Sequence, residues 1–174
     1  MARSKKVKRT DLKPQAPQRH VAKNLEQVNL ATADLTGAEL PKANLRHATL
    51  KETKLAKANL AGADLAHDNL SAADLAEATL TEANLEDADL RDANLARADL
   101  RGANLTGAKL GGADLTDANL EAADLTGSDP ERARSVRGAR LGGARGAPPP
   151  QQPAGDEAPE DERFDAEWRP RAYD

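Results

Sequence analysis

Cysteine and aromatic side chains are the residue types that this sequence most lacks. Among 174 residues there is no cysteine, and the chain has one phenylalanine, one tryptophan and one tyrosine: Phe164, Trp168 and Tyr173. The absence of cysteine excludes a disulfide framework, a thiolate zinc site and a cysteine nucleophile. A globular core normally takes much of its buried area from aromatic rings. The core of this protein must therefore be filled in another way.

Long apolar runs are also missing. No stretch approaches the roughly 20 apolar residues that a membrane-spanning helix needs. The first twenty residues are basic and lack the apolar stretch of a secretory signal. We therefore expect a soluble cytoplasmic protein with no membrane span.

The net charge of −4 conceals an asymmetry along the chain. Residues 1–20 carry +6, residues 21–130 carry −9, and residues 131–174 carry −1. Residues 61–90 hold eight acidic side chains and no Lys or Arg. This acidic stretch is the strongest charge feature of the sequence.

A five-residue repeat dominates the chain. Leucine occupies every fifth position from Leu25 to Leu125, 21 times without a gap, and alanine stands two places earlier in 17 of these repeats. Asn or Asp usually lies between the two, so the unit reads Ala-(Asp/Asn)-Leu-X-X. The exceptions at the alanine position are Lys23, Val28, Thr53 and Asp68.

A period of five fits neither regular secondary structure. On an α-helix it advances each leucine by about 140°, and on a flat strand it sends successive leucines to opposite sides. Asn and Asp are also poor in helix interiors, which disfavours a coiled coil. The leucines share one core only if the chain bends at every repeat, with Leu and Ala pointing inward and the X residues outward. Asn and Asp suit such corners because they bond to nearby backbone amides.

On these residues the sequence resembles the pentapeptide-repeat family over residues 24–129. The resemblance implies an all-β fold, a right-handed quadrilateral β-helix with four pentapeptides per coil and stacked leucines. Twenty-one repeats would give a little over five coils, a rod on the order of 25 Å long.

The segments around the repeats have distinct compositions. We expect a basic disordered arm at residues 1–20, the β-helix at 21–129, a partly helical cap at 130–146, and a disordered acidic, proline-rich tail at 147–174. Ser128-Asp129-Pro130-Glu131 is a helix-start signature, which predicts a short capping helix over residues 130–137. Ala139-Arg140-Leu141 resembles a further repeat one residue out of register.

The search for catalytic chemistry yields no constellation. His47 and His67 occupy equivalent positions one coil apart, with Asp87 next in the column. Such a column could bind a divalent metal, but two surface positions that merely coincide are the favoured interpretation. The carboxylates lie on a convex surface with no cleft to shift their pKa values. We therefore expect no enzyme activity, no metal and no cofactor.

The leading hypothesis is a non-catalytic protein-interaction scaffold whose partner is another protein. The candidate interaction surface consists of Asp64, Asp68, Asp74, Glu77, Glu82, Glu86, Asp87 and Asp89. Some pentapeptide-repeat proteins are thought to mimic DNA and protect type II topoisomerases, so the resemblance implies an alternative: a modulator of DNA gyrase or topoisomerase IV, serving antibiotic self-resistance. Two departures weaken that alternative. Such relatives often place Phe at the central position, which is always Leu here, and residues 126–150 lack the aromatics of their dimerising C-terminal module. A purely structural spacer and a homodimer both stay open.

Both termini carry candidate binding segments. The basic arm (Arg3, Lys5, Lys6, Lys8, Arg9) could contact nucleic acid or an acidic rod. No aromatic side chain interleaves with these charges, so no direct nucleic-acid site is supported. The tail aromatics Phe164, Trp168 and Tyr173 form a candidate docking motif. They could enter the groove of a partner or fold back onto the solenoid as a cap.

Overall fold

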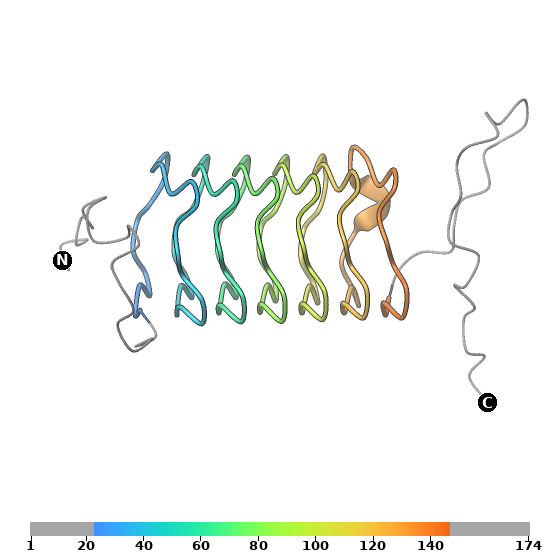
Figure 1. The fold of residues 1–174 in the computed structure, drawn as a ribbon, viewed down its shortest axis with the longest axis horizontal. Coiled ribbons are helices and arrows are strands. Elements are labelled where there is room, and N and C mark those ends of the chain that lie inside the picture. Colours follow the sequence, from blue (N-terminus) through green and yellow to red (C-terminus); the bar gives the residue numbers. More distant parts are fainter. Residues whose placement is uncertain (1–22, 147–174) are drawn as a thin grey trace, which may run out of the picture.

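The repeat folds into a rod of stacked coils. The computed structural model describes residues 23–146, and Figure 1 shows their coils following one another along a single axis. Parallel bridges join residues twenty apart, from Asn24–Asn44 to Asn104–Asp124. Each coil therefore contains four pentapeptides, as the resemblance to the pentapeptide-repeat family implied. The strands are reduced to these isolated bridges, one at each Asn/Asp position of the repeat.

Each corner of the coil is a tight turn. The amide of the inward Ala58 donates to the carbonyl of Leu55 at 2.9 Å, and Lys57 between them has φ of 60°. Fifteen non-glycine residues share this left-handed conformation, all at the second X position. An L-residue pays roughly 1–2 kcal/mol there, so the corner needs support from outside the turn. The Lys57 amide supplies it by donating to Ala76 of the next coil at 2.9 Å.

Leucine and alanine fill the interior. All the repeat leucines are buried, and from Leu40 onward none is more than 2% exposed. The inward alanines stack beside them, and small side chains are needed there because each coil closes around a narrow core. Thr53 and Asp68 are the two polar residues buried in this core. The Thr53 hydroxyl is satisfied because it donates to the Leu30 carbonyl at 2.8 Å.

The predicted capping helix over residues 130–137 is wrong. The chain makes a single turn of 3-10 helix, η2, at Pro130–Arg132, drawn as the orange coiled ribbon in Figure 1. Pro130 is buried in the place of a repeat leucine. Asp129 makes no side-chain cap bond; its Oδ1 instead accepts the amide of Leu110. The Asp129 carboxylate, which was predicted to cap a helix, therefore bonds to the backbone of the preceding coil.

The repeat resumes after η2 with one inserted residue. Bridges in this part join residues 21 apart, as in Asn119–Arg140 and Asp124–Arg145. The predicted out-of-register repeat at Ala139-Arg140-Leu141 is therefore confirmed. A helix that continues to residue 137 is excluded because the Arg134 amide pairs with the preceding coil, donating to the Ala113 carbonyl at 2.7 Å. Backbone pairing with the preceding coil therefore outweighs the local helix signal.

No helical segment of the described chain has the length and apolarity that crossing a membrane requires. The predicted basic arm at residues 1–20 and the predicted tail at 147–174 lie outside the described residues.

Candidate interaction surface

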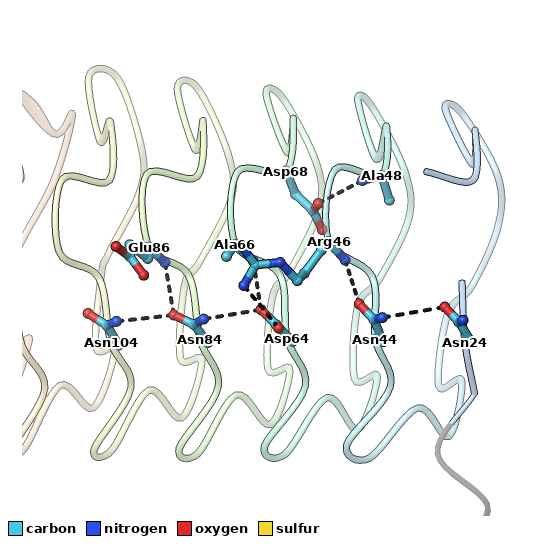
Figure 2. Close-up of polar contacts among 10 residues, drawn as sticks. All are labelled: Asn24, Asn44, Arg46, Ala48, Asp64, Ala66, Asp68, Asn84, Glu86 and Asn104. Carbon is cyan, nitrogen blue, oxygen red and sulfur yellow. Dashed lines mark hydrogen bonds and ion pairs between the residues drawn. The ribbon is translucent and has the colours of Figure 1, made fainter. Parts of the chain in front are cut away.

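A ladder of amides runs along one edge of the rod. It comprises the Asn/Asp residues Asn24, Asn44, Asp64, Asn84 and Asn104 (Figure 2). The Asn84 Nδ2 donates to Asp64 Oδ1 at 3.1 Å, and the Asn104 Nδ2 donates to Asn84 Oδ1 at 3.1 Å. Asn84 Oδ1 also accepts the Glu86 amide at 3.3 Å. The sequence predicted the backbone bond, but the bonds between coils appear only once residues twenty apart are adjacent.

Asp64 lies at a junction in this ladder. A carboxylate cannot donate to Asn44, and instead Asp64 Oδ2 accepts from Arg46 Nη1 at 3.3 Å. Its Oδ1 accepts from the Ala66 amide at 3.2 Å and from Asn84. The charge of Asp64 is therefore already neutralised within the rod.

Asp68 does not belong to the surface on which the sequence placed it. It occupies the inward alanine position, is 1% exposed, and lies among the leucines. One carboxyl oxygen accepts the Ala48 amide at 2.8 Å, as Figure 2 shows, while Oδ2 has no partner among the described residues. Burial raises the pKa of Asp68 to about 8. At neutral pH this carboxyl is therefore largely protonated and contributes little negative charge.

The other seven acids form a band that we call the acidic collar. Its members are Asp64, Asp74, Glu77, Glu82, Glu86, Asp87 and Asp89. Because successive pentapeptides occupy successive sides of the coil, Glu77, Glu82 and Asp87, each at the second X position, lie at three different corners. The collar thus surrounds the rod and does not form one acidic face.

Basic side chains neutralise several collar residues. Glu77 lies between two of them, 3.7 Å from Lys57 and 3.6 Å from Arg97. Asp89 bonds Arg91 at 2.6 Å, and this hydrogen bond lowers the pKa of Asp89. These bases come largely from neighbouring coils or from residues just beyond the collar. Counting the charges of residues 61–90 alone therefore overstated the negative charge at the surface of the rod.

The predicted histidine column exists as a stack. The rings of His47 and His67 lie 5.2 Å apart and are 9° from parallel. His67 Nδ1 lies 3.6 Å from Asp87 Oδ2. Metal ligation needs ring nitrogens that converge on one point, whereas parallel rings present their faces to each other. In the described part of the chain, no group of three or more His, Cys, Asp or Glu residues could hold a metal ion.

Sequence reasoning missed a basic end. Residues 131–146, which we call the last coil, carry five arginines against one glutamate, a net charge of +4. Arg134 pairs with Asp114 at 2.9 Å and Arg132 lies 3.9 Å from Asp129. The signal was present in the sequence, but it was averaged with the acidic residues that follow.

These features define a class of protein: a solenoid with a core of leucine and alanine, in which most charged and polar side chains occupy the outward positions. The chain belongs to the pentapeptide-repeat family, whose model matches residues 24–51, 43–81, 69–107 and 93–129 in eight copies. The fold is accordingly a right-handed β-helix.

Solved structures of pentapeptide-repeat proteins resemble the chain. Rfr23 from the cyanobacterium Cyanothece 51142 is 31% identical, with 64% of this chain and 84% of that chain covered and a TM-score of 0.51. HetL from Nostoc sp. strain PCC 7120, which is involved in heterocyst differentiation regulation, is 28% identical, with coverages of 70% and 75% and a TM-score of 0.38. QnrB1, a plasmid-mediated fluoroquinolone resistance protein, is 19% identical, with coverages of 70% and 76% and a TM-score of 0.34. No curated protein sequence matches the chain.

Proposed function

We propose that this protein is a non-catalytic, cytoplasmic interaction scaffold that binds another protein through the outward residues of its rod. The observation that carries the proposal is the separation of core from surface. Leucine and alanine positions account for the core, and the hydrogen bonds between coils fix the corners. The side chains at the two X positions of each repeat can therefore vary without loss of core packing, and they can carry a binding surface.

The acidic collar is the part of that surface we assign to the partner. Glu82 and Glu86 make no ion pair with any residue of the described rod, in contrast to Asp64, Glu77 and Asp89. They lie at successive corners of the coil, at the second and first X positions of successive repeats. Unpaired carboxylates on a rigid support favour a partner that supplies Lys or Arg.

A charge-reversal pull-down tests this assignment. We expect full-length E82K/E86K to lose partners that the unaltered protein retains. The matched control is E26K/E121K, which makes the same change in net charge elsewhere on the rod. Both variants should melt as the parent does, since neither alters a core position. Identical partner sets for the parent and E82K/E86K would remove the collar from the proposal.

The tail motif needs its own comparison. Phe164, Trp168 and Tyr173 lie outside the described residues, and their role as a docking motif stays a prediction. If full-length protein and a chain truncated after Arg145 retain the same partners, the tail takes no part in binding.

A DNA-mimicking modulator of a type II topoisomerase is the second candidate. The observation that favours it is the acidic excess of residues 61–90, eight acids without Lys or Arg. The ion pairs of the collar and the largely protonated Asp68 weigh against it, because they remove much of that charge. This candidate requires inhibition of gyrase supercoiling, or relief from a gyrase poison, that weakens with salt. E82K/E86K should abolish the effect, and an unchanged effect would exclude a charge-based mechanism.

A further inference from the structure

The last coil ends in an unfinished edge. In the coils before it, amides at the leucine position and at the second X position donate to the following coil, as the Leu115 amide does to Ser135 at 2.8 Å. The equivalent amides of Val136, Gly138 and Leu141 have no acceptor within residues 23–146. Open edges of this kind recruit other strands unless they are covered.

Apolar surface accompanies the unpaired amides. Val136 is 38% exposed, the most exposed large apolar side chain among residues 23–146, and Leu141 is only partly buried. One coil earlier, Leu115 and Leu120 are 1% and 2% exposed. The end of the rod thus presents apolar groups that every preceding coil buries.

The positive charge of the last coil limits which chain segment could bind to its open edge. The last coil carries +4, and of its arginines Arg137 and Arg140 form no ion pair within the described rod. A second copy meeting this end with its own last coil would bring another +4. Its first coil, residues 23–42, has two lysines against three acids, a net charge of only −1. Neither end of a second copy offers strong attraction.

The C-terminal segment of the same chain offers a strong opposite charge. Residues 147–174 begin directly after Gly146 at the edge and carry eight acids against three arginines, a net charge of −5. Seven of these acids lie between residues 156 and 167, around Phe164 and just before Trp168. Seventeen residues separate Gly146 from Phe164, and about 3.3 Å per residue gives more than enough reach for the segment to return.

We propose that residues 156–173 dock onto the last coil of their own chain and close its edge. In this arrangement Phe164 and Trp168 cover Val136 and Leu141, and the acids of the segment face Arg137 and Arg140. The contact shields the unpaired amides from other strands and so prevents end-to-end association. It is independent of the partner bound by the acidic collar.

Trp168 reports on this contact directly because it is the only tryptophan in the chain. In the full-length protein at low salt, its emission should lie at shorter wavelength than in the denatured chain, and acrylamide should quench it several-fold less. The variant R137E/R140E should return both values to those of the denatured chain. The matched control K42E/K54E makes the same charge change near the opposite end and should leave both values as in the parent. Far-UV circular dichroism verifies that each variant keeps the fold.

Four outcomes would overturn the proposal. Trp168 could be as accessible in the parent as in the denatured chain, or remain protected in R137E/R140E. Protection that disappears on dilution would assign the segment to a second copy. Protection that appears only when a protein partner is added would assign it to a groove on that partner.

Discussion

Replacing Asp68 by alanine should stabilise the protein, and the gain should grow with pH. Alanine is the residue of the repeat at this position, and Ala48 and Ala88 occupy it one coil to either side. The substitution leaves no amide without an acceptor, because Ala48 N–H also donates to the Leu45 carbonyl at 2.8 Å. The small void that results costs about 1 kcal/mol or less. Removal of the buried carboxyl outweighs this cost.

The pH dependence follows from the raised pKa. In the folded chain the pKa of Asp68 is about 8, against 3.8 in the unfolded chain. Between these values the folded state keeps a proton that the unfolded state has lost, so stability falls as pH rises through this window. Each pH unit removes about 1.4 kcal/mol, which accumulates to about 4 kcal/mol at pH 7 and about 6 kcal/mol above pH 8.

Denaturant unfolding of the parent and D68A at pH 4 to 9, followed by far-UV circular dichroism, measures this difference. Subtracting the two series removes the contribution of the other titratable groups. T53A is the matched control, because it also restores alanine at an inward position but removes no ionisable group. Its difference from the parent should be independent of pH. A gap between the parent and D68A that stays constant from pH 4 to 9 would refute the buried, protonated carboxyl.

Three further predictions concern the surface of the rod. Asn84→Ala removes one bond to each neighbouring coil and one to the Glu86 amide, and we expect a loss of about 1–3 kcal/mol in urea unfolding; an unchanged midpoint would show that the ladder contributes nothing. Glu77→Gln breaks ion pairs to two exposed bases, and we expect a loss below about 1 kcal/mol that vanishes in high salt; a larger, salt-independent loss would contradict screening by solvent. Ala122→Gly relieves a residue held at φ of 57°, and we expect a gain of up to about 1 kcal/mol in thermal unfolding; a lower melting temperature would show that the corner is not strained.

The core could be read from the repeat because its physical cause is local. A side chain every five residues can share one dry column only if the chain bends each time, and this condition alone places Leu25 to Leu125 inside. It also identified Thr53 and Asp68 as exceptions to the alanine position. The Thr53 hydroxyl has a carbonyl partner, whereas one carboxyl oxygen of Asp68 has no partner among the described residues. This difference depends on the neighbouring coil, so the sequence could not predict which of the two buried polar groups is satisfied.

The C-terminal end shows where local signals fail. The motif Ser128-Asp129-Pro130-Glu131 favours a helix by its own chemistry, yet only η2 forms, because backbone pairing with the preceding coil competes for the same amides. The conformation of the corners has the same origin. Fifteen residues other than glycine adopt positive φ because hydrogen bonds between coils hold them there, not because of their intrinsic preference.

The sequence by itself determined the five-residue repeat and the identity of the core, since these depend on spacing along the chain. Its resemblance to the pentapeptide-repeat family implied the class of fold and the four repeats per coil. Only the tertiary structure decided which charges remain unpaired, because an ion pair such as Lys57–Glu77 joins residues one full coil apart. The same adjacency dispersed the acidic residues around the rod, buried Asp68 among leucines and exposed Val136 at the last edge. Each of these outcomes depends on distances between coils, which spacing along the sequence does not give.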